Sequence, residues 1–224
     1  MTSTEIQILY VVCAVCSFVP ALVFHEFMHG FVAHALGDNT AKLKGRVSLN
    51  PLKHIDPFGT VILPALLLFI GGPIFGYAKP VPYNPRNFKN PRVGDVLVGL
   101  AGPLGNLLLA ILGGLAMYIM SAAPIAHNDY FFLVLYGIFL PQFIYINLFL
   151  MFFNLLPIPP LDGSSIFALL VPRKYLPQYY RIQQYALPVF LIVIFILPSL
   201  IHIDIIGLYL NVTAGNIASV LIPH

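Results

Sequence analysis

The sequence predicts an all-α polytopic membrane protein with about four to six transmembrane helices, on the evidence of its composition, its apolar segments and the placement of its basic residues. Of the 224 residues, 59% are hydrophobic and only 8% are charged, which is too few charges to cover a soluble globule. Two cysteines in a chain of this length exclude a disulfide framework. We therefore interpret the charges through membrane orientation, and no nucleic-acid partner is expected.

Four apolar segments are long enough to cross a hydrocarbon core that takes about 20 helical residues. They cover approximately residues 8–33, 95–120, 130–157 and 183–201. Each is predicted to be a helix, because lipid offers an isolated segment no other way to satisfy its backbone hydrogen bonds. The first segment is not expected to be a cleavable signal peptide, since no Lys or Arg precedes it and no small-residue cleavage site follows it.

The basic residues predict the orientation of these spans. All eleven Lys and Arg lie within residues 42–53, 79–92 and 173–181. By the positive-inside rule, these three segments are cytoplasmic and the N-terminus is outside. The residues between the second and third spans carry no basic side chain, which agrees with an outer loop.

Two further apolar segments do not fit a simple count of spans. Residues 57–76 have basic loops on both sides and are interrupted by Pro64 and by Gly71, Gly72 and Pro73. We predict a re-entrant or surface-lying element here, which is tolerated where protein or water covers the backbone; a fifth ordinary span is the alternative. The tail, residues 203–222, is either a last span or an interfacial helix.

The clearest chemical signal is His25-Glu26-Phe27-Met28-His29, which has the pattern H-E-x-x-H. Residues four apart share one face of a helix, so both imidazoles can reach the same zinc ion, while Glu26 can act as a general base on a water. The motif lies inside an apolar span, where ionisable side chains are costly and mark function. We predict that His25 and His29 bind one zinc ion per chain and that Glu26 is catalytic.

A catalytic zinc ion usually takes a third protein ligand. The extended pattern H-E-x-x-H-x-x-G-x-x-H fails, because Val32 and Ala35 stand where it needs Gly and His, and no glutamate lies downstream. Most aspartates are too close in sequence, on the outer side, or at the start of the second span, which leaves Asp56 and Asp162. Asp162 is the better candidate, because it follows prolines that break the third helix near its cytoplasmic end, where the two histidines also lie.

These residues together resemble the site-2 protease family of intramembrane zinc metalloproteases. H-E-x-x-H lies in an early span, and Asn154-Leu-Leu-Pro-Ile-Pro-Pro-Leu-Asp162-Gly163 follows in a later one. The stretches at 46–51, 54–57, 76–85 and 101–106 are similar to a compact prokaryotic subgroup. The resemblance covers about residues 15–175 and implies that His25, His29 and Asp162 bind zinc and that Glu26 activates water. It also implies a multi-pass protein of a prokaryotic cell membrane.

We expect a single membrane domain over residues 1–224, with a catalytic core at about 8–175, C-terminal helices at about 183–224 and no PDZ or CBS domain. Its predicted partners are a transmembrane protein substrate and membrane lipid. The predicted activity is cleavage of transmembrane or membrane-associated proteins near the cytoplasmic face. The alternative is a non-proteolytic zinc-binding membrane protein, either a metal carrier or a scaffold; a carrier should place polar groups along a path through the bilayer, whereas here they gather at one end.

Four polar residues near the motif have two interpretations each. Asn106 and Asn154 either hydrogen-bond a substrate strand or an oxyanion, or join helices to one another. His54 and Asp56 either stand behind a zinc ligand or gate the site, or are ordinary loop residues before Pro57. The hydrophilic stretch at 42–50 is predicted to be a short β-like cytoplasmic loop whose edge pairs with an extended substrate.

Overall fold

The computed structural model describes residues 2–63, 66, 69, 76–122, 130–183, 185–192 and 202–223. Three helices in it are long and apolar enough to cross a membrane. They are α1 (Ser3–Ala35), α4 (Pro91–Ala122), and a helix over Tyr130–Asn154 that comprises α5 (Tyr130–Val134), the π-helical turn η4 (Leu135–Phe139) and α6 (Leu140–Asn154). The first three predicted spans are therefore helices, each close to its expected bounds.

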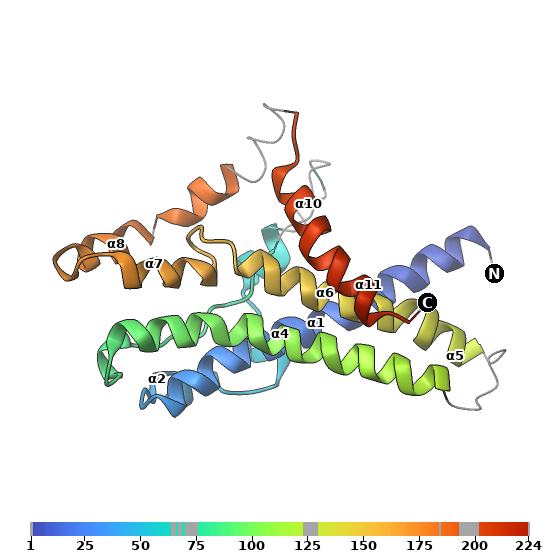
Figure 1. The fold of residues 1–224 in the computed structure, drawn as a ribbon, viewed down its shortest axis with the longest axis horizontal. Coiled ribbons are helices and arrows are strands. Elements are labelled where there is room, and N and C mark those ends of the chain that lie inside the picture. The colour runs from blue at the N-terminus through green and yellow to red at the C-terminus, as the bar shows by residue number, and fades with distance from the viewer. Residues whose placement is uncertain are drawn as a thin grey trace.

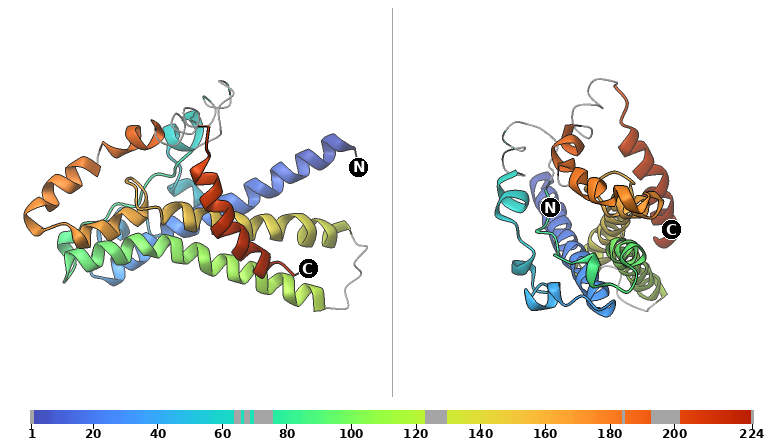
Figure 2. Two further views of the ribbon diagram at one scale, coloured as in Figure 1. Left: turned by 45° about the horizontal axis from the view of Figure 1, so that its top comes forward. Right: turned by 90° about the vertical axis from the view of Figure 1, so that its left-hand side faces the viewer.

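The three long helices pack side by side and form the body of the molecule (Figure 1, Figure 2). A capping box between Thr2 and Glu5 begins α1, because the first backbone N–H groups of a helix lack partners within it. Small residues on α4 let its neighbours approach closely: a Cβ at Gly105 would lie 2.7 Å from Cγ of Met28 on α1, and one at Gly113 would lie 2.9 Å from Cγ1 of Ile144 on α6. Close backbone approach of this kind is how helices associate in lipid.

The remaining elements are short and lie around this body. Between α1 and α4 they are α2 (Thr40–Leu43), the 3₁₀ turn η1 (Pro51–Lys53), the π-helical turn η2 (Pro57–Ile62) and the 3₁₀ turn η3 (Pro85–Asn87). After α6 they are η5 (Asp162–Ser164), α7 (Ser165–Leu170), η6 (Arg173–Tyr175), α8 (Leu176–Gln183), α10 (Ile205–Leu210), η7 (Asn211–Gly215) and α11 (Asn216–Leu221).

The C-terminal helices close one side of the core. The chain over Ile205–Leu221 is helical and crosses α6 (Figure 1). Ala214 and Ala218 on this segment pack into a buried cluster with Met117 of α4 and with Ile144 and Leu148 of α6. Whether this tail spans the membrane stays a prediction, as does the total number of spans.

Two predicted membrane segments are described for only about half of their residues. Of the expected span at 183–201, residues 183 and 185–192 are described, and of the expected re-entrant element at 57–76, residues 57–63, 66, 69 and 76. The second begins as the helical turn η2, which Asp56 caps by accepting from the N–H groups of Phe58 and Gly59. The re-entrant path stays a prediction.

The predicted β-like loop at 42–50 is wrong. Residues 42 and 43 belong to α2, and the part of the chain that the structure describes contains no strand. The segment satisfies its backbone locally: the N–H of Gly45 donates to the carbonyl of Lys42 at 2.9 Å, and the N–H of Arg46 donates to that of Ala41 at 2.9 Å. Gly45 has a φ of +64°, which turns the chain instead of extending it.

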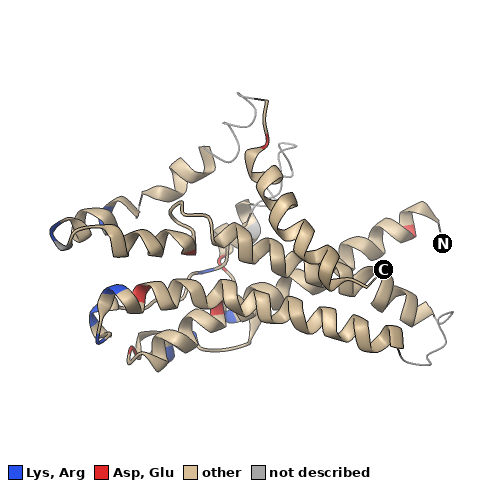
Figure 3. Ribbon diagram, in the orientation of Figure 1, with Lys and Arg blue, Asp and Glu red and all other residues tan. Residues whose placement is uncertain are grey.

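The charged side chains are unevenly distributed along the molecule. Among the described residues, Lys and Arg lie toward the end that carries α2 and α8, while the opposite end, with the N-terminus and α5, has none (Figure 3). This distribution follows the separation of basic segments that the sequence analysis used to predict orientation.

Candidate metal centre

The two histidines of α1 and an aspartate from beyond α6 meet in the interior. His25 and His29 lie one turn apart on α1, both buried, with their Nε2 atoms 3.0 Å from one another. Oδ2 of Asp162 lies 3.0 Å from Nε2 of His25 and 3.3 Å from Nε2 of His29. The three ligand atoms all lie within 4.8 Å of one another, so a single ion could contact all of them.

The chain reaches this position through glycines that permit close backbone contacts. After α6 ends at Asn154, the chain folds back on itself, and a Cβ at Gly163 would lie 2.3 Å from the carbonyl oxygen of Leu155. On the facing helix α4, a Cβ at Gly99 would lie 3.0 Å from the carbonyl oxygen of Asp162. Glycine at these two positions lets the turn η5 pack against α4 and directs Asp162 toward the histidines.

A chain of two asparagines fixes the orientation of the His25 ring. The Nδ2 group of Asn106 donates to the carbonyl of Ala21 at 3.1 Å and to Oδ1 of Asn147 at 2.9 Å, and Nδ2 of Asn147 donates to the carbonyl of Phe143 at 2.8 Å. Both amides are held because a backbone carbonyl can only accept. Oδ1 of Asn106 therefore faces Nδ1 of His25, at 2.7 Å, and accepts a hydrogen bond from the Nδ1–H group.

His29 is oriented in the same way by a backbone group. Its Nδ1 lies 2.7 Å from the carbonyl oxygen of Val98 on α4, so Nδ1 carries the proton and Nε2 has a free lone pair. Both rings consequently present unprotonated Nε2 atoms to Asp162. This is the tautomer that a metal-binding histidine needs, with the opposite nitrogen hydrogen-bonded to a carbonyl.

The buried atoms at the centre fit a zinc ion. Oδ2 of Asp162 is buried without a hydrogen-bond donor, so three electron pairs converge with no hydrogen between them. Two imidazoles and one carboxylate are a common ligand set for catalytic zinc. Gly102 of α4 borders the same space, and a Cβ there would lie 2.5 Å from Nε2 of His29 and 2.6 Å from Nε2 of His25.

Asp162 is the acidic member of this group, and an ionised carboxylate is the form that would bind a metal ion.

Glu26 lies next to His25 and contacts a separate, non-helical segment before α4. Its Oε2 accepts from the backbone N–H of Val81 at 3.2 Å. The segment around Val81 is anchored on either side, because the N–H of Lys79 donates to the carbonyl of His54 at 2.9 Å and the N–H of Asn84 donates to Oδ2 of Asp38 at 2.7 Å. The carboxylate of Glu26 is thus held half-buried beside the two histidines.

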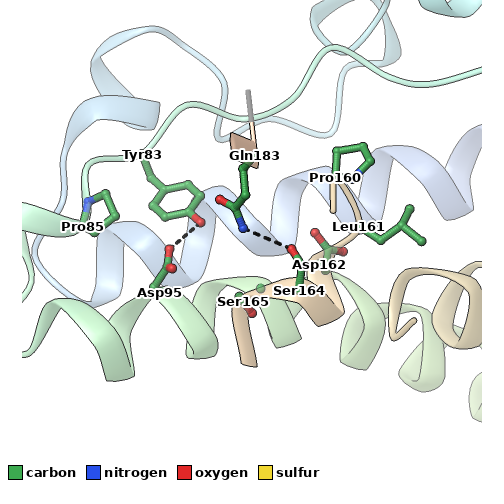
Figure 4. Close-up of a pocket in the computed structure, with 10 residues that line it drawn as sticks. Tyr83, Pro85, Asp95, Pro160, Leu161, Asp162, Ser164, Ser165 and Gln183 are labelled. Carbon is green, nitrogen blue, oxygen red and sulfur yellow. Dashed lines mark hydrogen bonds between the residues drawn. The ribbon is translucent and has the colours of Figure 1, made fainter. Parts of the chain in front are cut away.

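A cavity of about 340 Å³ lies beside Asp162 (Figure 4). It is lined by the end of the 76–85 segment, the start of α4, the turn η5 and the end of α8. Two hydrogen bonds border it, from the hydroxyl of Tyr83 to Asp95 at 2.8 Å and from Gln183 to the hydroxyl of Ser164 at 3.3 Å (Figure 4). The cavity gives the aspartate side of the centre a polar-lined space that can hold water.

Of the other four predicted site residues, one contacts a candidate ligand and three do not. Asn106 contacts the centre through His25, and both of its N–H groups are already used, which favours the interhelical interpretation. Asn154 donates to the carbonyl of Leu150 on its own helix at 2.9 Å. His54 is buried, with Nε2 2.7 Å from the carbonyl oxygen of Ser48, and Asp56 caps η2. Neither belongs to the group that could hold a metal ion, which comprises His25, His29 and Asp162.

Asn147 is a functional candidate that sequence reasoning missed. It is fully buried on α6 and holds Asn106 in place. The available signal was an amide in the middle of an apolar helix, which is the same signal that drew attention to Asn106 and Asn154.

The chain is similar to a family of peptidases and to proteins named as zinc metalloproteases. Residues 135–197 match the model of peptidase family M50. Two relatives have names that begin "Putative zinc metalloprotease". YwhC of Bacillus subtilis is 42% identical over 188 residues, which cover 82% of this chain and 80% of that protein. Rip2 of Mycobacterium tuberculosis is 31% identical over 193 residues, which cover 84% and 68% of the two chains. No solved structure matches the chain.

Proposed function

This chain belongs to peptidase family M50, the site-2 protease family of membrane metalloproteases, and from that premise we propose that it is an intramembrane zinc metalloendopeptidase. Its substrates are transmembrane or membrane-associated proteins, cut near the cytoplasmic face in regulated intramembrane proteolysis. The observation that carries the proposal is the convergence of His25, His29 and Asp162 within 4.8 Å, beside Glu26.

His25, His29 and Asp162 would hold one zinc ion. When bound, zinc supplies a Lewis acid that polarises a carbonyl group and lowers the pKa of water toward neutrality. The protein supplies the orientation: Asn106 and the Val98 carbonyl keep the protons on the Nδ1 atoms, so both Nε2 lone pairs stay available. Burial of the two imidazoles keeps bulk water from competing for these positions.

Glu26 would move the protons of the reaction. Its carboxylate takes a proton from the attacking water and then passes it to the departing amine of the cleaved peptide bond. The Val81 N–H that now donates to Glu26 holds one of its oxygens in place. The polar-lined cavity beside Asp162 is the route by which water would enter.

A transmembrane substrate must unwind before its peptide bonds can react, because a helix engages them in hydrogen bonds. The backbone that lies beside the base is the segment around Val81 and not residues 42–50.

The test pairs zinc content with cleavage of a model transmembrane substrate by purified protein in detergent. We expect Glu26→Gln to keep about one zinc ion per chain and to lose cleavage, and Asp162→Ala to lose both. Asp204→Ala is the matched control, because it removes a carboxylate that caps α10 and should change neither readout.

Two outcomes would contradict the proposal. Cleavage by Glu26→Gln at the wild-type rate would remove Glu26 from the reaction. Zinc bound by the wild type with no cleavage of several different transmembrane substrates would favour the alternative function, a metal carrier or scaffold.

A further inference from the structure

A second cavity, of about 350 Å³, lies apart from the metal centre and is strongly basic. Its lining includes Lys44, Arg46, Lys53 and Lys79, together with Leu52 and Ile55, and contains no acidic residue. None of the four cations has a carboxylate within ion-pair distance in the part of the chain that the structure describes. Like charges gathered without a counter-charge repel one another, and an anion placed between them removes that repulsion.

The fold holds these cations around one space. Gly45, with its φ of +64°, turns the chain at the end of α2, and the Nζ of Lys53 lies 3.6 Å from the position that a Cβ of Gly45 would take. The buried guanidinium of Arg46 donates to the carbonyls of Lys79 and Pro80, which joins two loops far apart in sequence. The cavity is therefore a built feature that combines three segments.

The segment that lines this cavity also carries exposed leucines. Leu52, in the lining, is 75% exposed, and Leu43, which precedes Lys44 in the sequence, is 85% exposed. Water disfavours such side chains on a surface loop, whereas the boundary between lipid headgroups and acyl chains accepts apolar and basic side chains together. A free phosphate ion would explain the lysines and leave the leucines unexplained.

We propose that this cavity binds the headgroup phosphate of an anionic phospholipid of the cytoplasmic leaflet, with Lys44, Arg46, Lys53 and Lys79 around the phosphate and Leu52 toward the acyl chains. Basic pockets beside transmembrane helices on this side of a membrane suit such headgroups. The lipid would be bound as a component of the protein's surroundings and would not be a substrate.

The position of the cavity connects it to the metal centre. Arg46 binds the carbonyls of Lys79 and Pro80, and the next residue, Val81, donates its N–H to Glu26. A phosphate that holds Arg46 and Lys79 together would steady the segment that positions Glu26. This second part of the inference, an effect of anionic lipid on cleavage, rests on the proposed protease activity; lipid binding itself does not.

The test measures bound lipid by native mass spectrometry of the full chain reconstituted with phosphatidylglycerol and phosphatidylcholine. The variant is Lys44→Gln with Lys53→Gln and Lys79→Gln. The matched control removes three lysines outside the cavity, Lys42→Gln with Lys89→Gln and Lys174→Gln. Zinc content and melting temperature check that both variants fold.

We expect the wild type and the control to retain more phosphatidylglycerol than phosphatidylcholine. In the cavity variant, the ratio of bound phosphatidylglycerol to bound phosphatidylcholine should fall by at least about tenfold. Equal retention by the two variants, or equal loss, would overturn the proposal, because either result shows general attraction to the surface. Displacement of the lipid by millimolar inorganic phosphate would also overturn it, since the site would then recognise a free ion.

Discussion

At the scale of single residues, the candidate metal centre depends on side chains that would not contact the ion. His25 is oriented by Asn106, and Asn106 is oriented by Asn147 and the Ala21 carbonyl. Such partners behind a ligand usually contribute a factor of about 10 to 100 in metal affinity. The three residues of this chain come from α1, α4 and α6, so the packing of all three helices determines how one imidazole points.

We predict that Asn147→Leu weakens zinc binding by about 10- to 100-fold. Leucine has a similar volume but accepts no hydrogen bond, so Asn106 loses one of the two acceptors that hold its amide and can rotate away from His25. The measurement is a zinc titration against a competing chelator, with ¹⁵N shifts of the histidine rings to report which nitrogen of His25 carries the proton.

Thr213→Val is the matched control for this prediction, because its hydroxyl also donates to a carbonyl one turn earlier, that of Tyr209 at 2.7 Å, in a helix away from the centre. An Asn147→Leu protein that melts earlier but binds zinc like the wild type would show that Asn147 only joins helices.

The chemistry of the candidate site could be predicted from local spacing. H-E-x-x-H requires only that α1 be a helix, and Asp162 follows from depth and from the prolines that end α6. Asn147 and the Val98 carbonyl could not be predicted in this way, because their roles arise from contacts between helices that are distant in sequence. The sequence left two interpretations for His54 and for Asp56 for the same reason. In the structure, His54 lies beside the carbonyl of Ser48 and Asp56 caps η2, so both act within their own loop.

At the scale of elements, a single buried carboxylate joins the end of α1 to the segment before α4. Asp38 is fully buried, and its oxygens accept from the hydroxyl of Thr40 at 2.6 Å, the amide of Asn87 at 2.6 Å and the backbone N–H of Asn84 at 2.7 Å. Burial raises the pKa of this carboxyl, but the hydrogen bonds from Thr40, Asn84 and Asn87 lower it by more, so the pKa lies below its ordinary value of 3.8.

We predict that Asp38→Asn destabilises the protein by about 1–3 kcal/mol at pH 7, because an amide nitrogen would face donors that need an acceptor. The folded pKa is lowered, so the stabilisation by the carboxylate is fully present above the ordinary pKa of 3.8 and is lost as the pH falls through the folded value. The difference in melting temperature between the two proteins should therefore narrow as the pH falls from 7 to below 3.8. A difference that stays constant over this range would contradict the assignment.

The elements themselves were predictable to different degrees. Lipid requires long apolar helices, so α1, α4 and the helix over Tyr130–Asn154 follow from composition and length alone. The loop at 42–50 was predicted to be β-like from its hydrophilic residues, but Gly45 in the left-handed region and the neighbouring α2 make it a turn. Short polar segments take their structure from such local backbone geometry, which the hydrophilic character of their residues does not reveal.

At the scale of the whole molecule, a bound metal ion would join parts of the chain that are far apart. Two ligands lie on α1, and the third lies after α6 in the turn η5. An ion that binds the folded state and not the unfolded one stabilises it by about 2.7 kcal/mol at a concentration 100 times its dissociation constant. The fold and the occupancy of the centre are thus coupled.

We predict that a chelator lowers the melting temperature of the wild type, and that the decrease is much smaller in Asp162→Ala, which already lacks a ligand. The measurement is thermal unfolding in detergent with and without chelator, followed by readdition of zinc. If chelator lowered the melting temperature equally in both proteins, the stabilising ion would bind elsewhere.

The length of α1 can also be compared with the thickness of a membrane, to estimate how deep the candidate site lies. With a rise of about 1.5 Å per residue, the helix carries His25 about 30 Å from Glu5, and this matches the hydrocarbon thickness of about 30 Å. If the charged Glu5 lies at one boundary of the hydrocarbon core, the same rise predicts that His25 lies near the other boundary. At that depth the proposed protease would need no aqueous channel through half of the membrane, and a transmembrane substrate would need to unwind only at its end.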